Sequence, residues 1–211
     1  MRKSQLIYQY IREQGAVSKQ DIVIGLGLSL PTITQNLNNL AELGLIDTSK
    51  KISNTGGRNA TAYSYIEKAR YAVGLYLNRH HINCVAVDLS GNVISLIRVR
   101  ENFDLNDDNY LRKIGETVEE VKKDTGLSDD RFLGVGIAVQ GLISDDGERV
   151  TYGLTLNFTG VTRADIAKYI PYHNRLFHDS AAAGYAEVWD RNDLDDAFYL
   201  SLSNSVGGAV I

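Results

Sequence analysis

Apolar residues recur at helical spacing in three short segments near the start of the chain, at residues 5–14, 19–26 and 30–43. The first segment places Leu6, Tyr10 and Ile11 on one stripe and is followed by a glycine. Ser18 precedes the second segment as a candidate N-cap, with Asp21 at the position that completes a capping box. The pattern therefore predicts three consecutive helices.

The third of these segments has one apolar face and one polar face. Its apolar positions at helical spacing are Ile33, Leu37, Leu40 and Ala41. The opposite face carries amides and hydroxyls, which suit hydrogen bonds to base edges and phosphates in the major groove of DNA, whereas a merely solvated helix more often uses Glu and Lys. The expected DNA contacts are the candidate N-cap Ser29 and Pro31, Thr32, Thr34, Gln35, Asn36 and Asn39. An ordinary polar surface helix is the alternative.

Two β-prone runs, residues 45–47 and 61–66, follow this helix and flank a polar loop. The loop carries cations and a glycine pair that lets its tip approach a surface closely. Its candidate DNA contacts are Lys50, Lys51, Gly56, Gly57 and Arg58. Helix, helix, helix and hairpin is the order of a winged helix-turn-helix, in which these cations would lie on the wing against the DNA. The alternative is an ordinary mobile hairpin loop.

The apolar pattern changes after a short charged connector at residues 67–70. Strand-like runs are expected at residues 71–77, 82–88, 93–100, 132–139, 176–177 and 197–202, and helical segments at residues 106–123, 162–170 and 181–189. Three antiparallel strands followed by alternating helices and strands are typical of one lobe of the ribonuclease-H-like, actin-like ATPase fold. The predicted class is α/β with a mixed sheet, and the predicted domains are residues 1–66 and 71–211.

Charge differs between the two predicted domains. Residues 1–66 hold 7 Lys and Arg against 4 Asp and Glu, whereas residues 67–211 hold 15 against 22. A basic domain joined to an acidic one indicates that only the first meets a polyanion. We expect neither a secretory leader nor a membrane span, because no apolar run is long enough. The single cysteine, Cys84, fits a reducing compartment, so a cytoplasmic location without a membrane partner is expected.

Four segments of the second domain carry a specific resemblance. They are GVGIAVQGLISDDGERV at residues 134–150, LTLNFTGV at 154–161, FHDSAAAGYAE at 177–187 and LSLSNSVGGAVI at 200–211. In this order they resemble motifs of the ROK family, which comprises repressors, open reading frames and sugar kinases. The first domain, with GLSLPTITQNLNNLAELGLI at residues 27–46 and TGGR before a strand, is similar to the repressor branch. The resemblance covers essentially the whole chain.

The resemblance implies a sugar site. Asp179 takes the place of the kinases' catalytic aspartate, which acts there as general base on the sugar hydroxyl. Asn157 anchors the segment that resembles the family's sugar-side loop, and Gln140 stands where the family usually has proline. The expected contacts of a sugar effector are Gly141, Asn157, His178 and Asp179. A simple cap of the following helix is the alternative for Asp179.

The resemblance also implies that ATP chemistry has been lost. The first phosphate loop of the kinases reads D-I-G-G-T-K, and the aligned residues here are Tyr76, Asn78, Arg79 and His80. A bulky phenol therefore replaces the carboxylate that helps to hold Mg²⁺. In the second loop, Ser-Asn-Ser at residues 203–205 replaces Gly-Thr-Gly. We expect no catalytic residue, no cofactor and no metal site, since His80 and His81 alone do not form one.

These observations predict a sugar-responsive, DNA-binding regulator of transcription, with repression as its expected action. Its expected partners are a double-stranded DNA operator, a sugar or sugar-phosphate effector, and further copies of the chain in a homodimer or higher oligomer. The resemblance implies a second lobe with more sugar ligands and a zinc loop. The sequence given ends at Ile211, before the segments expected to form them. Two alternatives stay open: a sugar kinase with an appended DNA-binding domain, and a non-sensing DNA-binding or dimerisation fragment. The sequence names neither the sugar nor the operator.

Overall fold

The computed structural model describes residues 2–52, 60–189, 196–202 and 206–211. The chain divides into two compact units, Met1–Ala69 and Arg70–Ile211, each with a buried core of its own. The division lies inside the connector expected from the sequence, where a short 3-10 helix, η1, spans Glu67–Ala69.

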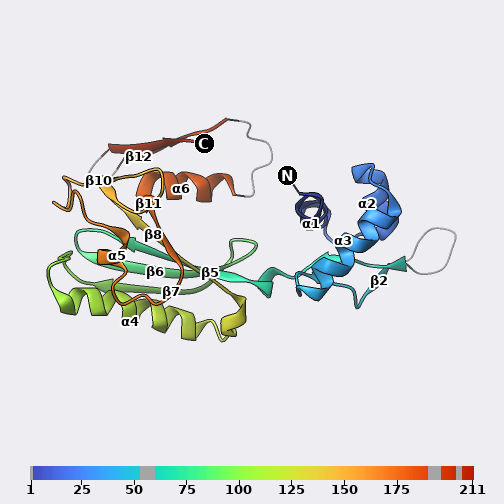
Figure 1. Ribbon diagram of the computed structural model, residues 1–211, viewed down its shortest axis with the longest axis horizontal. Coiled ribbons are helices and arrows are strands. Elements are labelled where there is room, and N and C mark those ends of the chain that lie inside the picture. Colours follow the sequence, from blue (N-terminus) through green and yellow to red (C-terminus); the bar gives the residue numbers. More distant parts are fainter. Residues whose placement is uncertain (1, 53–59, 190–195, 203–205) are drawn as a thin grey trace. The chain divides into compact units, whose positions relative to one another are not determined.

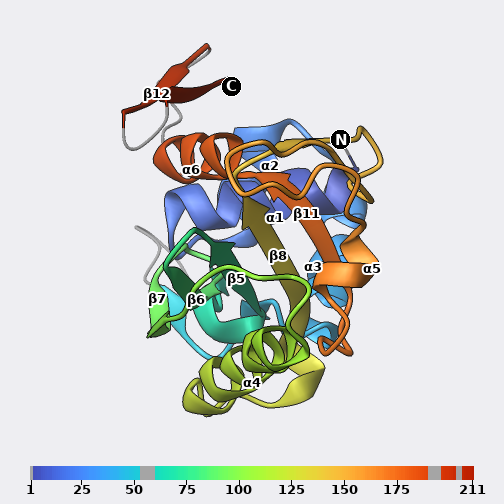
Figure 2. The ribbon, with the colours of Figure 1, turned by 90° about the vertical axis from the view of Figure 1, so that its left-hand side faces the viewer.

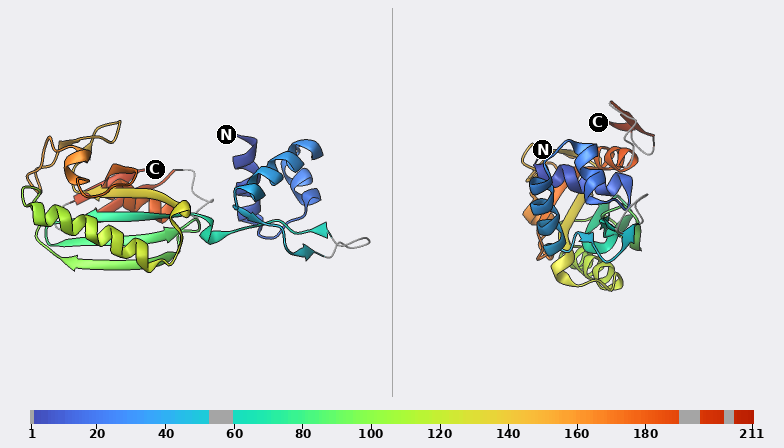
Figure 3. Two further views of the ribbon diagram at one scale, coloured as in Figure 1. Left: turned by 60° about the horizontal axis from the view of Figure 1, so that its bottom comes forward. Right: turned by 90° about the vertical axis from the view of Figure 1, so that its right-hand side faces the viewer.

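The first unit begins with three helices, α1 (Lys3–Gln14), α2 (Lys19–Leu26) and α3 (Leu30–Glu42), which lie on one side of a hairpin (Figure 3). The expected capping box opens α2: the Asp21 N–H donates to Oγ of Ser18 at 3.2 Å, and the Ser18 N–H donates to Oδ2 of Asp21 at 2.8 Å. Ser29 precedes α3 but does not cap it with its side chain, because its Oγ lies 2.9 Å from Oγ1 of Thr32 instead.

An aliphatic core holds the three helices together. Its buried members are Ile7, Ile11, Val17, Ile22, Ile33, Leu37, Leu40 and Ile46. The face of α3 agrees with the expected stripe, but that of α1 does not: Ile7 and Ile11 are buried, whereas Leu6 and Tyr10 are only half-buried. Residues four apart stand on the same side of a helix, so Ile7 fits the side of Ile11 better than Leu6 does.

Four short strands form the hairpin of the first unit: β1 (Ile46–Asp47), β2 (Lys51–Ile52), β3 (Ala60–Thr61) and β4 (Ser64–Tyr65). β1 pairs with β4 and β2 with β3, both antiparallel. Val17, in the turn between α1 and α2, exchanges two backbone hydrogen bonds with Tyr63, at 3.0 and 2.8 Å. These bonds fix the hairpin to the helices.

The second unit contains a five-stranded sheet in the order β11-β8-β5-β6-β7 (Figure 1). Its strands are β5 (Tyr71–Leu77), β6 (His81–Asp88), β7 (Val93–Arg100), β8 (Phe132–Val139) and β11 (Asn174–His178). β6 pairs antiparallel with β5 and β7, whereas β8 pairs parallel with β5 and β11. The expected α/β class with a mixed sheet is therefore confirmed.

Helices cover the two faces of this sheet differently (Figures 1 and 2). Alternate residues of β5 and β6, such as Leu75 and Cys84, are buried on the face that α4 (Asp108–Asp124) covers. Helix α6 (Asp179–Val188) lies over the opposite face near β8 and β11. The hairpin of β12 (Phe198–Leu202) and β13 (Val206–Val210) packs on the outer side of α6.

Short elements join the layers of the second unit: η2 (Asp129–Arg131), β9 (Leu142–Ile143), β10 (Val150–Tyr152) and α5 (Arg163–Ile166). The helix expected at residues 162–170 is only four residues long, because its backbone leaves the helical conformation at Ala167. In contrast, α6 begins at Asp179, two residues before the helix expected at 181–189. None of the described helices is long and apolar enough to cross a lipid bilayer.

Candidate functional site

The polar face of α3 contains two kinds of side chain. Thr34 and Asn36 are engaged by their own helix: Oγ1 of Thr34 donates to the Leu30 carbonyl and Nδ2 of Asn36 to the Thr32 carbonyl, each at 2.8 Å. Gln35 and Asn39 are exposed, as is Asn38, which the sequence analysis did not select. The exposed amides are therefore the groups best placed to meet a ligand from outside.

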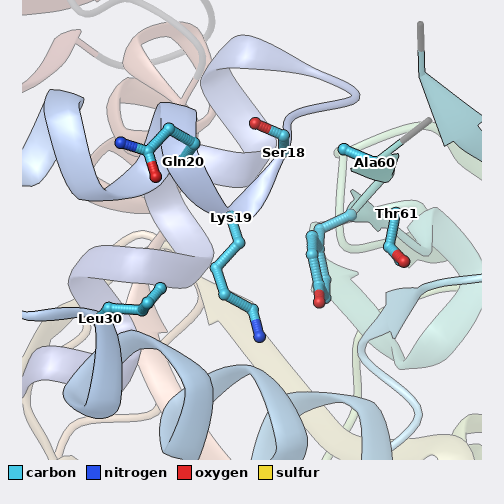
Figure 4. A pocket seen from close by; sticks show the side chains of 7 residues that line it. Ser18, Lys19, Gln20, Leu30, Ala60 and Thr61 are labelled. Carbon is cyan, nitrogen blue, oxygen red and sulfur yellow. The ribbon is translucent and has the colours of Figure 1, made fainter. Parts of the chain in front are cut away.

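A hollow of about 310 Å³ opens beside the starts of α2 and α3. Its lining residues are Ser18, Lys19, Gln20, Leu30, Ala60, Thr61 and Tyr63. Figure 4 shows the Lys19 side chain extending between Leu30 on one side and Ala60 and Thr61 on the other. The hollow thus brings a cation, a hydroxyl and an amide next to α3.

The sequence analysis missed Lys19, Gln20 and Thr61 as candidate contacts. Lys19 directly follows the N-cap Ser18, so its position at the first turn of α2 was visible in the sequence. The approach of Lys19 to β3 could not be read from the sequence, because it depends on the backbone hydrogen bonds between Val17 and Tyr63.

The predicted wing residues are only partly described. Lys50 and Lys51 are exposed at the start of β2, where Lys51 pairs with Thr61. The predicted contacts Gly56, Gly57 and Arg58 lie outside the described residues.

In the second unit, a pocket of about 260 Å³ lies where β11 ends and α6 begins. Its lining residues are Gln140, Gly141, Leu142, Tyr152, Leu154, Thr155, His178, Asp179, Ser180, Val206 and Gly207. Parallel pairing sets His178 of β11 beside Val139 of β8, so the residues that follow these two strands meet at one edge of the sheet. Ligands of open α/β sheets bind at this edge, outside the carboxyl ends of the strands.

The expected effector residues Gly141, His178 and Asp179 all line this pocket. A side chain at Gly141 would not fit, because its Cβ would lie 2.9 Å from the Tyr152 carbonyl oxygen and 3.0 Å from Cγ1 of Val150. Asn157 is not among the described lining residues, although Leu154 and Thr155 of the same turn are. Its exposed, left-handed backbone (φ 54°) ends that turn, and its contact with a sugar stays a prediction.

Asp179 has a local role as well as a place in the pocket. Its Oδ1 accepts hydrogen bonds from the Ser180 N–H at 2.7 Å and from the Ser180 hydroxyl at 3.3 Å. Nε2 of His178 lies 3.6 Å from the same oxygen. The carboxylate thus accepts one N–H of the first turn of α6 but does not cap the helix, whose N-cap position is His178, and its side chain remains 22% exposed.

Tyr76 lies on the other side of Asp179, in a hollow that both residues line. Its hydroxyl accepts a hydrogen bond from Nε2 of Gln140 at 3.3 Å. Burial, and then the negative charge of Asp179, raise the pKa of Tyr76 above its usual value. The phenol is therefore protonated at neutral pH and able to donate a hydrogen bond to the carboxylate.

The turn between β5 and β6 is closed by its own asparagine. Oδ1 of Asn78 accepts the backbone N–H groups of His80 at 3.0 Å and His81 at 2.9 Å. Nη2 of Arg79 donates to the Thr155 carbonyl at 2.8 Å. The backbone donors that a glycine loop would offer to a phosphate are thus occupied within the turn. Across the described chain, no three His, Cys, Asp or Glu side chains are arranged to hold a metal ion.

Known proteins resemble the chain along most of its length. In the Escherichia coli K12 DNA-binding transcriptional dual regulator NagC, 167 aligned residues are 23% identical, covering 71% of this chain and 36% of NagC. The N-acetylglucosamine repressor of Shigella flexneri matches to the same extent. The chain therefore spans about a third of the length of these curated relatives.

Solved structures share the fold. A ROK family transcriptional regulator, a homologue of the E. coli Mlc protein, has a TM-score of 0.75 and 20% identity, and the match covers 99% of this chain and 53% of the regulator. A ROK family glucokinase from Streptomyces griseus, in complex with glucose and AMPPNP, has a TM-score of 0.54 and 17% identity, and the match covers 67% of this chain and 44% of the glucokinase. The model of the ROK family matches residues 72–211. The chain is therefore a member of the ROK family.

Proposed function

We propose that the chain is a sugar-responsive regulator of transcription whose first unit is a winged helix-turn-helix. In this proposal α3 enters the major groove, and the hairpin that carries Lys50 and Lys51 forms the wing. The exposed amides of Gln35 and Asn39 support direct contact with base edges. Lys19, in the hollow between α2 and β3, is suited to a phosphate of the same DNA strand.

The second unit is proposed to bind a sugar without phosphorylating it. One combination of features carries this proposal. Asp179 lines a pocket, whereas in the turn after β5 the Asn78 side chain already accepts the backbone N–H groups that a phosphate would need. The carboxylate and the neighbouring Gln140 amide can hydrogen-bond sugar hydroxyls, whereas ATP would lack both a metal-side carboxylate at Tyr76 and free backbone donors. Two relatives support a regulatory function, since one is named a DNA-binding transcriptional dual regulator and the other an N-acetylglucosamine repressor.

Regulation follows from linkage between two sites. If sugar binding favours one arrangement of a dimer, the spacing of its two DNA-binding units changes, and with it the affinity for paired half-sites. A homodimer or higher oligomer and a cytoplasmic location belong to this proposal. Repression is the proposed action on the target promoter.

The DNA-binding part is tested by titrating the full chain with a selected operator and with random DNA at several salt concentrations. We expect tighter binding to the operator. Lys19→Ala should weaken both complexes and reduce the salt slope by about 1, because it removes one phosphate contact. Lys123→Ala, at an exposed lysine of α4, is the matched control and should leave both affinities unchanged. Equal affinity of the wild type for operator and random DNA would contradict the proposal.

The kinase alternative has support in the fold, because sugar kinases also share it. A coupled assay with ATP, Mg²⁺ and a panel of hexoses should show no turnover by the full chain. Turnover that disappears in Asp179→Asn would establish the kinase instead. If DNA binds selectively but no sugar alters it, the chain is a non-sensing DNA-binding fragment.

A further inference from the structure

An apolar groove lies in the second unit, beside α6 on the sheet face opposite α4. Its volume is about 450 Å³. Its lining residues are Gly74, Leu75, Tyr76, Asn83, Val85, Leu96, Gly136, Ala138, Phe177, Ala182 and Tyr185. None of these residues lines the pocket that contains Asp179. The described lining therefore forms a separate site, to which the proposed function gives no role.

The floor of the groove lacks large side chains. Gly74 of β5 and Gly136 of β8 are paired in register, and Ala138 follows on the same face of β8. A Cβ at Gly74 would lie 3.2 Å from Cγ1 of Val85, and a Cβ at Gly136 would lie 3.4 Å from Cε2 of Phe177. Larger side chains at either glycine would therefore project between the walls of the groove. Glycine in the interior of a strand weakens the sheet and often marks the close approach of a ligand.

The walls of the groove are large apolar side chains that remain open to solvent. Leu96 of β7 is 65% exposed, Tyr185 of α6 is 59% exposed and Phe177 of β11 is 40% exposed. Single exposed apolar side chains are common, but a contiguous group around a concave surface indicates a binding site. A volume of about 450 Å³ lies within the range of small-molecule pockets, roughly 300–1,000 Å³. The groove thus fits a ligand with a flat or extended apolar body.

Cations stand at one end of the groove. Antiparallel pairing sets Arg98 of β7 opposite Asn83, one of the lining residues. The next pair on this face is Arg100 with His81, and cross-strand partners point to the same side of a sheet. Nη2 of Arg98 lies 3.3 Å from each ring nitrogen of His81. Burial, and then the charges of the two arginines, lower the pKa of His81, so this imidazole is neutral at pH 7.

The positive charge at this end is not balanced by a carboxylate of the described chain. No ion pair between described residues includes Arg98 or Arg100. The neutral imidazole of His81 does not compensate the guanidinium beside it. A carboxylate would do so, because guanidinium groups bind carboxylates through two parallel hydrogen bonds. The groove therefore combines an apolar floor and walls with an end that suits an anion.

We propose that this groove binds an organic acid with one carboxylate and an apolar aromatic or aliphatic body. The body lies on the glycine floor between Leu96 and Tyr185, and the carboxylate meets Arg98. A docked protein fits less well, because a stable interface buries about 800 Å² on each partner, whereas the described lining encloses a volume of small-molecule size. The site goes beyond the proposed function and does not depend on sugar binding.

The test uses two probes of similar shape and different charge, naphthoate and naphthylmethanol. Both are titrated into the isotope-labelled full chain at pH 7 and followed by amide NMR signals. Naphthoate should bind with a dissociation constant of about 1 mM or tighter and shift amides of the groove, such as those of Gly74 and Gly136. Naphthylmethanol should bind about two- to fivefold more weakly, because it lacks the exposed ion pair. Added salt should weaken naphthoate alone.

Variants at exposed positions separate the apolar walls from the charge. Leu96→Ala should weaken both probes about fivefold, because it removes an apolar wall, whereas Leu133→Ala, at another exposed leucine of the sheet, should change neither. Arg98→Ala should weaken naphthoate about two- to fivefold and remove most of the difference between the probes. Arg98→Lys should retain part of that difference. Lys123→Ala, on the α4 side of the sheet, should leave it unchanged.

Each contrary outcome has a definite meaning. Binding of neither probe, or signal changes that avoid the groove, overturns the proposal. Equal affinity for the two probes overturns the role of Arg98. A wild-type dimer that Leu96→Ala dissociates in analytical ultracentrifugation would assign the groove to contact between copies of the chain instead. Sugar binding without naphthoate binding overturns this proposal alone, and naphthoate binding without sugar binding overturns only the sugar sensor.

Discussion

The side-chain amides of this chain differ in whether they are already hydrogen-bonded within the chain. Asn78 uses its side-chain oxygen to close a turn, and Asn36 donates its amide to the Thr32 carbonyl within α3. Gln35, the neighbour of Asn36, is exposed on the same helix. Residue type alone therefore does not identify a DNA contact, since an amide already bonded to its own helix must break that bond to reach a base.

This difference predicts an order of effects on DNA recognition. Gln35→Ala should cost about 1–3 kcal/mol at a preferred operator and relax selectivity at one base position. Asn36→Ala should have a smaller effect on selectivity, because its amide is held by Thr32. Affinities of both variants for a set of single-base operator changes give the measurement. A larger loss of selectivity in Asn36→Ala would reverse the assignment.

At the scale of elements, one carboxylate joins α4 to the segment after α5. Oδ1 of Asp108, in the first turn of α4, accepts hydrogen bonds from Nζ of Lys168 at 2.7 Å and from the Tyr169 hydroxyl at 2.8 Å. These two bonds lower the pKa of Asp108 to about 2. Gly115 of α4 also approaches the Tyr169 backbone, where a Cβ would lie 2.5 Å from the carbonyl oxygen. The helix and this segment are thus held by an ion pair and hydrogen bonds at Asp108 and by close backbone packing at Gly115.

The lowered pKa has a pH consequence with a definite sign. A carboxyl whose pKa is lower in the folded state stabilises the fold above its unfolded pKa, near 3.9, and loses that contribution as the pH falls towards 2. Asp108→Asn should therefore unfold more easily than the wild type at pH 6, and the difference should shrink below pH 4. Thermal unfolding across pH 2–7 measures it, with the exposed Asp104→Asn as control. A difference independent of pH would exclude ionisation as the cause.

At the scale of the whole molecule, the chain contains two units with separate cores. Ile33 of α3 and Ile137 of β8 are both fully buried, one in each core. A compact unit with its own core can fold by itself, although a unit as small as the first buries less of its surface and is less stable.

Two matched core variants test this independence. Ile33→Ala and Ile137→Ala should each cost about 2–5 kcal/mol, because each leaves a cavity in a packed core. Each should lower the unfolding transition of its own unit and leave the other in place. Native-state hydrogen exchange of α3 amides follows the first unit, and that of β8 amides follows the second. A single transition shifted equally by both variants would show that the units unfold together.

The sequence by itself determined the features that depend on neighbouring residues. Helical spacing placed α2 and the two faces of α3, and the Ser18–Asp21 capping box marked where α2 begins. The resemblance to the ROK family also predicted a lost phosphate loop, because residues 76–80 lack the aspartate and glycines of the family motif. Such signals are local, because capping, periodicity and turn chemistry involve residues only a few positions apart.

Only the tertiary structure decided which distant groups meet. Tyr76, Gln140 and Asp179 come together because β5, β8 and β11 run parallel side by side, so that their carboxyl ends share one edge of the sheet. The pairing of Val17 with Tyr63 likewise brings Lys19 to β3. Strand order and register depend on packing across the whole unit. The spacing of these residues along the chain therefore does not predict that they meet.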